Sequence, residues 1–156
     1  MEVNEVSGII VDAAMVVHSA LGPGLLERPY QACLKHELIA RGLKCFSEVS
    51  MPVVYNGVEI DIGYRLDLLV EDQVIVEVKS LYALAPIHRM QLLTYLRLAN
   101  KPVGLLINFG AAHLRHGISR VINSPSAASA SSANPLRFPH LDQTITWEPR
   151  PSTEER

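Results

Sequence analysis

The sequence predicts an α/β fold in which helices flank a mixed central β-sheet. Apolar residues recur at helical spacing through residues 3–41, whereas β-branched runs follow between residues 46 and 122, with one further helical segment among them. The chain has 156 residues, of which 48% are hydrophobic, which is enough for one packed core. The expected order is helix, helix, three antiparallel strands, helix, strand and strand.

Two helices are expected at the N-terminal end. Val3–Leu21 places its apolar residues on one broad helical face. Gly22–Gly24, with a proline at its centre, ends this helix because proline cannot continue the hydrogen-bond ladder. A second helix is expected from Leu25 or Leu26 to Arg41.

A long β-hairpin is expected next. Phe46–Tyr55 and Val58–Val70 read as strands, and the intervening Asn56-Gly57 is a strong signal for a tight hairpin turn. Pro52 predicts an edge or an irregularity in the first strand, and Gly63 predicts a bend in the second.

The remaining elements complete the sheet. The polar turn Glu71-Asp72-Gln73 leads into a strand over Val74–Ser80, whose β-branched composition is typical of a central strand. Pro86 fits the first turn of a helix that ends near Asn100. Pro102–Phe109 predicts a fourth strand and Leu114–Ile122 a short last one, with residues 118, 121 and 122 facing inward.

The composition changes at residue 124, which divides the chain into two parts. We expect one folded domain over residues 1–123 and a low-complexity linker with a proline-rich tail over residues 124–156. Leu136, Phe138 and Trp147 are among the apolar residues of the tail that could dock onto another surface.

Charge and cysteine usage restrict location and partners. The formal net charge is −2, so a nucleic-acid partner would need a divalent cation or a local basic patch at the acidic site. Cys33 and Cys45 lack metal-site spacing and are expected to be reduced thiols, although a single disulfide stays open. The apolar run from Gly8 to Val17 is interrupted by Asp12, so no membrane span is expected and the location is predicted to be cytoplasmic.

An acidic and basic cluster is predicted on two paired strands. Asp67 lies within an apolar strand, and Glu77 and Lys79, two residues apart, share a face of the next strand. A three-residue turn would pair Val70 with Val74, and counting back from there places Asp67 opposite Glu77. Two carboxylates at this separation repel unless a cation lies between them, and Mg²⁺ prefers such oxygen ligands.

A plainer interpretation of the same charges stays open. Charged residues in strands usually face solvent, and an ion pair between Glu and Lys on the same face contributes little to stability. Asp67 could instead pair with Arg65 or Lys79.

Two of the expected helices carry further candidates. Glu27 falls in the first turn of the second helix, where a carboxylate either stabilises the helix end or turns toward the sheet as a metal ligand. Tyr30 shares that face and is either a contact for nucleic acid or a core tyrosine. Gln91 and Tyr95, four residues apart on the later helix, either contact a phosphate or base or form a polar helix flank.

Together these motifs resemble the GxxExxY proteins, a branch of the PD-(D/E)XK nuclease superfamily. Gly24, Glu27 and Tyr30 match the naming motif, and Asp67 followed by Glu77-Val78-Lys79 is similar to the superfamily core. The pair Gln91 and Tyr95 is similar to the helix motif of the exonuclease branch. The match covers about residues 4–123, and Leu66 stands where the superfamily often has proline.

The resemblance implies a restriction-endonuclease-like sandwich and a Mg²⁺-dependent nuclease acting on DNA, with Mn²⁺ as an alternative metal. It implies catalytic roles for Asp67, Glu77 and Lys79, and metal ligands from Glu27, Asp67, Glu77 and the Val78 carbonyl. It implies nucleic-acid contacts from Gln91, Tyr95 and Tyr30. The alternative is a catalytically silent nucleic-acid-binding or protein-interaction module on the same fold, and self-association stays open.

Overall fold

The structure is a computed structural model that describes residues 1–124, apart from the side chain of Ile62. The predicted tail from residue 125 onward lies outside the described residues. The elements are α1 (Val3–Leu21), α2 (Glu27–Ala40), β1 (Cys45–Tyr55), β2 (Val58–Val70), β3 (Val74–Lys79), α3 (Pro86–Ala99), β4 (Val103–Asn108), the 3₁₀ helix η1 (Leu114–His116) and β5 (Ile118–Ile122).

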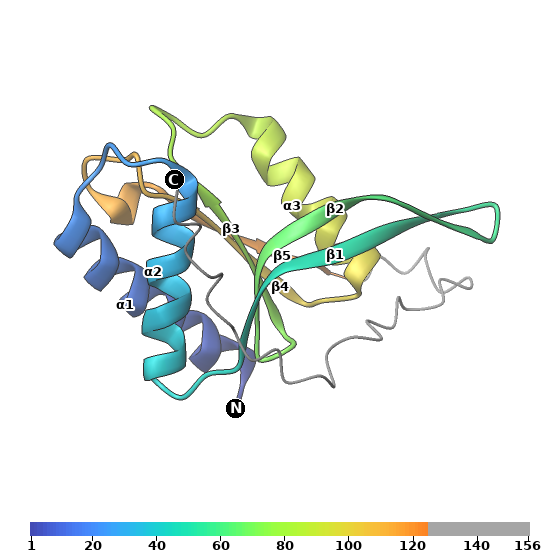
Figure 1. The fold of residues 1–156 in the computed structure, drawn as a ribbon, viewed down its shortest axis with the longest axis horizontal. Coiled ribbons are helices and arrows are strands. Elements are labelled where there is room, and N and C mark those ends of the chain that lie inside the picture. The colour runs from blue at the N-terminus through green and yellow to red at the C-terminus, as the bar shows by residue number, and fades with distance from the viewer. Residues whose placement is uncertain (125–156) are drawn as a thin grey trace, which may run out of the picture.

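The five strands form one mixed sheet in the order β1-β2-β3-β4-β5 (Figure 1). Strands β1, β2 and β3 pair antiparallel, β3 and β4 pair parallel, and β5 returns antiparallel to β4. The parallel pair is joined through α3, as parallel neighbours need a crossover connection. The predicted α/β class, with a mixed sheet flanked by helices, is confirmed.

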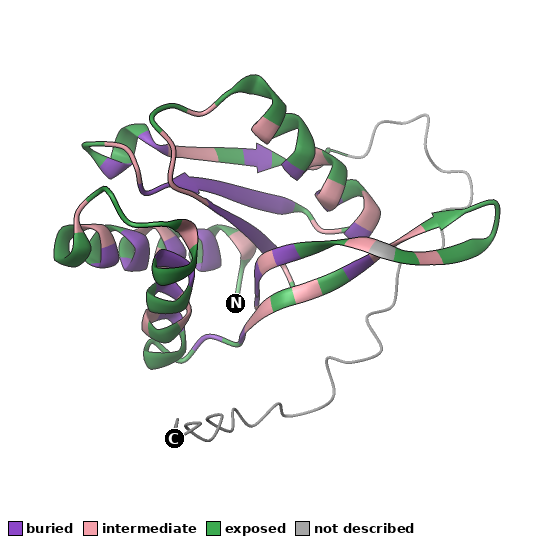
Figure 2. Cartoon of the chain, turned by 45° about the horizontal axis from the view of Figure 1, so that its top comes forward, coloured by how far each residue is buried: buried purple, intermediate pink, exposed green. Residues whose placement is uncertain are grey.

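The helices cover opposite faces of the sheet and create two apolar layers. Helices α1 and α2 pack on one face, and their buried residues meet Leu68, Val76 and Leu105. Helix α3 packs on the other face, where Leu92 and Leu96 meet Ile75 and other sheet residues. Figure 2 shows the consequence, because the central strands are buried while the outer faces of the helices are exposed.

Helix α1 departs from the sequence expectation about membrane spans. An 18-residue window of this 19-residue helix has a mean hydropathy of 1.2, so by length and composition alone it is apolar enough to cross a membrane. The expectation that no such segment exists was therefore wrong. In the structure its apolar face, which includes Val6, Ile10 and Val17, packs into the core, and Glu5 and Asp12 lie on the exposed side.

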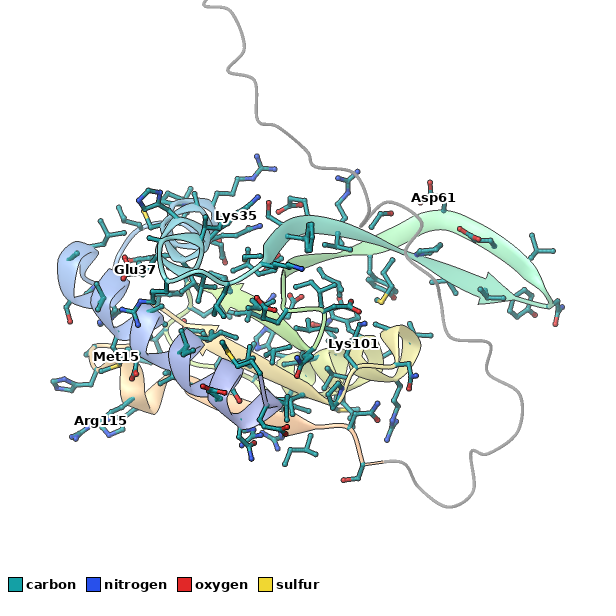
Figure 3. All side chains as sticks on the ribbon, turned by 90° about the horizontal axis from the view of Figure 1, so that it is seen from below. Met15, Lys35, Glu37, Asp61, Lys101 and Arg115 are labelled. Atoms are coloured by element: carbon teal, nitrogen blue, oxygen red, sulfur yellow. The ribbon has the colours of Figure 1, made fainter. Side chains whose placement is uncertain are left out.

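The hairpin of β1 and β2 projects beyond the rest of the sheet (Figure 1). Asn56 and Gly57 both have positive φ, at 49° and 73°, as a tight turn of this kind requires. The register shifts between Met51 and Val53, where a Cβ on Gly63 would lie 2.3 Å from the Met51 carbonyl oxygen. The irregularity predicted at Pro52 is thus confirmed, and the bend predicted at Gly63 stays a prediction. Asp61 lies on this projecting part (Figure 3).

The last predicted strand is shorter than expected. Residues 114–116 form η1, and β5 begins at Ile118. Gly117 lies so close to β4 that a Cβ would meet the Asn108 carbonyl oxygen at 2.5 Å, so the chain turns here before it pairs. Val121 faces inward as expected, whereas Ile122 is exposed.

Candidate functional site

The predicted cluster lies where strands β2 and β3 stop pairing. Their antiparallel ladder runs from Val70 opposite Val74 to Leu68 opposite Val76, and one step further would pair Asp67 with Glu77. The three-residue turn therefore sets the predicted register.

Side chains replace the ladder at that step. The Val78 N–H donates to Asp67 Oδ2 over 2.8 Å, and the Asp67 N–H lies 3.5 Å from Glu77 Oε1. Each carboxylate thus satisfies a backbone donor of the other strand, which is how buried backbone groups stay paired where a ladder ends. The arrangement holds the two acidic groups close together inside the sheet.

Burial gives this acidic pair unusual proton affinity. Glu77 is only 7% exposed, and burial, with the neighbouring Asp67 charge next in importance, raises the pKa of its carboxyl to about 8. Burial also raises the pKa of Asp67, against the opposing effect of the Val78 N–H. Ionising both carboxylates at this separation is unfavourable in free energy unless a cation offsets their charge.

Lys79 supplies some positive charge but does not neutralise the pair. It is half-buried near the end of β3, and its ammonium lowers the pKa of both carboxyls, although by less than burial raises them. Within the described residues, Lys79 forms no ion pair with either carboxylate. The lysine therefore lies near the acidic pair with its ammonium available to another group.

The donor set fits a small divalent cation. Asp67 and Glu77 offer hard oxygen ligands, and the Val78 carbonyl points to the same side of β3 as the N–H that Asp67 binds. Among the described residues, no three His, Cys, Asp or Glu side chains are gathered closely enough to form a preformed cage. Mg²⁺ is commonly held by one or two carboxylates together with water, so the pair suits it without a third side chain.

The loop between α1 and α2 is held against this region by Tyr30. The tyrosine hydroxyl donates to the Gly22 carbonyl and accepts from the Leu25 N–H over 3.2 Å. Its ring stacks on Phe109, with centroids 4.5 Å apart. Gly24 has a φ of 111°, which only glycine adopts readily.

This packing corrects one predicted role. Tyr30 is fully buried, so it cannot touch nucleic acid in this conformation. The core interpretation, which the sequence left open, is the one that the structure supports. The tyrosine shapes the loop that leads into α2.

Glu27 is the first residue of α2, and its charge acts on Asp67 of the acidic pair. It is half-buried, and its charge is the smallest of the causes that raise the pKa of Asp67. The loop before it is joined to the end of β3, because the Ser80 hydroxyl donates to the Leu25 carbonyl. The charge of Glu27 therefore affects Asp67, and no hydrogen bond joins the two residues within the described part of the chain.

Helix α3 brings one of its two candidates to the site. Tyr95 is half-buried, and burial, followed by the charge of Glu77, raises its pKa. Its ring lies 5.2 Å from that of Tyr64 on β2. Gln91, one turn earlier, is exposed and makes no hydrogen bond within the described part of the chain. Tyr95 thus borders the acidic pair, whereas Gln91 faces solvent.

Three polar residues near the site were missed by sequence reasoning. The buried Gln31 donates to Glu48 and to the Asp67 carbonyl. Asn108, beside Lys79 in the sheet, accepts from the Leu81 N–H through its amide oxygen and donates to the Leu81 carbonyl through its amide nitrogen. A glutamine directly after a motif tyrosine and an asparagine at the end of an apolar strand were the available sequence signals.

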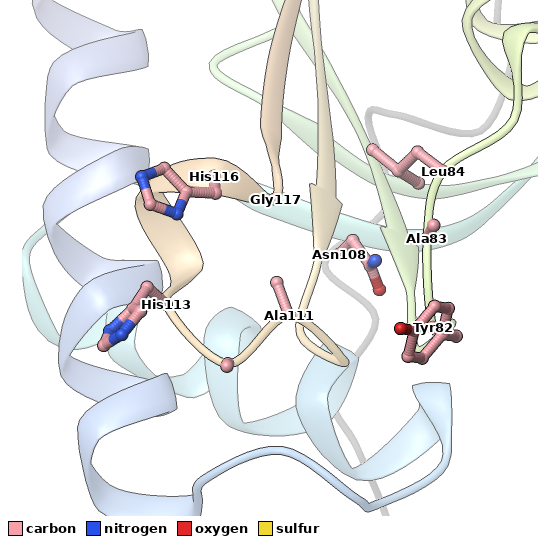
Figure 4. Close-up of a pocket in the computed structure, with 9 residues that line it drawn as sticks. Tyr82, Ala83, Leu84, Asn108, Ala111, His113, His116 and Gly117 are labelled. Carbon is pink, nitrogen blue, oxygen red and sulfur yellow. The ribbon is translucent and has the colours of Figure 1, made fainter.

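Two pockets lie beside the ends of β3 and β4 in the described part of the chain. One of about 380 Å³ lies at the end of β4 and includes Tyr82, Asn108, His113 and His116 (Figure 4). Neither Asp67 nor Glu77 lines it. The acidic site is therefore identified by its two carboxylates and by the point where β2 and β3 stop pairing, and not by a pocket.

Fold and site together define a nuclease-like domain, with an acidic pair and a lysine at the separation of two central strands. A family model of the PD-(D/E)XK nuclease superfamily matches residues 4–121, and the chain belongs to that superfamily. No curated protein and no solved structure matches the chain. The match supports a nuclease-like function that involves nucleic acid, and nucleases of this superfamily generally depend on a divalent metal.

Proposed function

We propose that this protein is a Mg²⁺-dependent nuclease that hydrolyses phosphodiester bonds in DNA, with Mn²⁺ as a substitute metal. The observation that carries the proposal is the close pair of the half-buried Asp67 and the buried Glu77, joined through the backbone at the separation of β2 and β3. Burial and mutual repulsion raise the pKa of Glu77 to about 8, so a bound cation would be favoured.

Asp67 and Glu77, with the Val78 carbonyl, would hold the metal, and Glu27 would approach from α2. The metal, when bound, offsets charge on the attacked phosphate and favours deprotonation of the attacking water. Lys79 has an ammonium that no carboxylate of the described residues binds, so it is free to orient that water or to stabilise the negative transition state.

Tyr95 and Gln91 would place the nucleic-acid strand beside the carboxylates. The pKa of the Tyr95 hydroxyl supports this assignment, because burial and then the charge of Glu77 raise it. Gln91 is exposed one turn away and would reach a more distant phosphate or base.

We also assign the chain to the GxxExxY branch of the superfamily. Gly24, Glu27 and Tyr30 form one structural unit, in which the tyrosine fixes the loop, the glycine permits its turn and the glutamate opens α2. Such a unit explains the motif spacing physically. Cytoplasmic location and self-association stay predictions, the latter to be checked by light scattering.

Cleavage assays test the proposal directly. Single-stranded and double-stranded DNA would be incubated with the protein in Mg²⁺, in Mn²⁺ and in EDTA, and with the variant Lys79→Ala. We expect cleavage with either metal, none in EDTA, and a loss of about 10²–10³-fold for Lys79→Ala. Activity that survives both EDTA and Lys79→Ala would remove this mechanism.

A matched lysine variant controls for net charge. Lys44 is exposed and lies beside the turn that joins β2 to β3, at the opposite end of β3 from Lys79. Lys44→Ala removes the same charge and is expected to retain cleavage. Equal losses in the two variants would show a general charge effect in place of a role for Lys79.

A second candidate function is a nucleic-acid-binding module without turnover. The absence of a three-residue ligand cage within residues 1–124 favours it. It predicts salt-sensitive DNA binding with no cleavage by any divalent ion.

A further inference from the structure

In both β1 and β2, the alternation of side chains between the two faces of the sheet is interrupted at one register position. Leu68 of β2 belongs to the core layer under α1 and α2, whereas Leu66 belongs to the layer under α3. On β1, Cys45 packs in the first layer and Val49 against the second. A regular strand would keep positions two or four apart on one face. The reversal therefore falls between these residues on both strands.

Glu48 and Asp67 occupy that position. The register pairs Ser47 with Leu68 and Val49 with Leu66, so Glu48 comes opposite Asp67. Glu48 has a φ of 54°, a left-handed conformation that residues other than glycine rarely adopt. The irregularity of the ladder thus coincides with a residue of the acidic pair.

Gln31 of α2 bridges the two strands at this point. Its Nε2 donates to Glu48 Oε1 over 2.7 Å and to the Asp67 carbonyl oxygen over 3.0 Å. The side chain is only 8% exposed, and a buried amide is costly without partners. Both N–H groups of the Gln31 amide donate hydrogen bonds in this bridge. Helix α2 therefore holds the main chain of Asp67 from one side, while β3 holds its carboxylate from the other.

Glu48 also adds negative charge to the site. Its carboxylate is among the causes that raise the pKa of both Asp67 and Glu77, after burial in each case. Gln31 keeps this carboxylate on the side of the acidic pair through the same hydrogen bond. The bridge thus affects both the geometry and the charge of the pair.

We propose that Gln31 and Glu48 are positioning residues for the metal site, in which the Gln31 amide fixes Asp67 where β2 leaves β3 and Glu48 strengthens cation binding. This inference rests on the proposed function, since it requires a metal at Asp67 and Glu77. Residues that orient metal ligands commonly change metal affinity by about 10–100-fold when replaced.

The test is the dissociation constant for Mn²⁺, measured on the full chain by the electron paramagnetic resonance signal of free Mn²⁺. Gln31→Met keeps the approximate size of the side chain and removes both donors. We expect it to weaken Mn²⁺ binding about tenfold or more. A purely structural role would lower the unfolding temperature in EDTA and leave the affinity of the folded protein unchanged, which would overturn the inference.

Ser47→Ala is the matched control. Ser47 neighbours Glu48 on β1 and accepts a hydrogen bond of 2.8 Å from Lys35, about one turn beyond Gln31 on α2. The variant removes a helix-to-strand bond of the same kind without touching Asp67, so its Mn²⁺ affinity should equal that of the wild type. Equal weakening in Gln31→Met and Ser47→Ala would contradict the proposal.

Glu48→Gln separates charge from geometry and covers the case in which Gln31→Met does not fold. The new amide oxygen still accepts from Gln31, and Glu48 is exposed enough to tolerate the change. Loss of one nearby charge should weaken Mn²⁺ binding about tenfold. Unchanged affinity would overturn the role of Glu48. If the wild type itself binds no Mn²⁺, the proposed function fails first, which distinguishes the two failures.

Discussion

The two ends of the β2–β3 pair differ in what holds the strands together. At the turn end, Leu68–Val70 and Val74–Val76 form a regular ladder of buried apolar residues. At the other end, Asp67 and Glu77 bind the backbone through their side chains, and the ladder stops. The turn end of the two strands thus stabilises the fold, whereas the other end carries the acidic pair. Mutations at the turn end should therefore affect stability, and mutations at the other end should affect activity.

The largest expected effect is on activity at the charged end. Glu77→Gln keeps the shape of the side chain and removes one proposed ligand charge, so DNA cleavage should fall about 10³-fold or more. The folded state should not be weakened, because a glutamine is neutral, as the protonated Glu77 carboxyl of the metal-free protein is. Cleavage rates and thermal unfolding in EDTA check both parts. Activity near that of the wild type would contradict the proposed role.

The reverse is expected at the apolar end. Leu68 is fully buried, and Leu68→Ala should lower the free energy of unfolding by about 2–5 kcal/mol. The fraction of molecules that stays folded should cleave DNA at nearly the wild-type rate, since Leu68 points to the layer under α1 and α2. Denaturant unfolding and active-site titration measure the two quantities. A loss of activity as large as that of Glu77→Gln would contradict this separation, because it would show that the apolar end of the strand pair is also needed for cleavage.

The pH dependence of stability sharpens the contrast. Burial raises the pKa of Glu77 from 4.5 to about 8, so the folded metal-free protein keeps a proton that the unfolded chain has lost. Stability should therefore be greatest below pH 4.5 as far as this group is concerned, and fall by about 1.4 kcal/mol per pH unit until pH 8.

Two comparisons isolate this contribution. Glu77→Gln should lose the slope, and saturating Mg²⁺ should reduce it because the metal favours the deprotonated carboxylate. Chemical unfolding at several pH values in EDTA provides the measurement. A wild-type slope equal to that of Glu77→Gln would mean that Glu77 ionises normally in the folded state.

The smallest expected effect lies in the loop beside the site. Tyr30→Phe leaves the Leu25 N–H and the Gly22 carbonyl without their partner, which should cost about 1–3 kcal/mol. Stacking on Phe109 should persist, so the helix pair stays assembled. Unfolding by urea checks the loss. A cost well above about 3 kcal/mol would give this hydroxyl a greater structural role than its two bonds imply.

The sequence predicts the turn end of the strand pair better than the outer hairpin. A three-residue turn leaves little freedom in the β2–β3 register, so Asp67 and Glu77 could be placed together by counting. The hairpin does not allow this, because extra residues of β2 shift its register between Ile60 and Tyr64. A regular ladder counted back from Tyr55 and Val58 would place Glu48 opposite Arg65, away from the acidic pair.

Tertiary contacts explain the other differences. Tyr30 matches a motif, but nothing in the local sequence shows that Phe109 would cover its ring or that the loop backbone would bind its hydroxyl. Gln31 shows no periodic signal, since its two partners come from separate strands. Periodicity found the helices and the apolar strands, whereas these polar contacts depend on how the elements pack.

The most direct test of the central claim is a crystal structure of the protein soaked with Mn²⁺ and recorded at a wavelength that gives anomalous scattering. We predict an anomalous peak between the carboxylates of Asp67 and Glu77, at about 2.0–2.3 Å from their nearest oxygens. A metal-free site in which Lys79 bridges both carboxylates, or a peak elsewhere in the molecule, would contradict the assignment of this end of the β2–β3 pair as the metal centre.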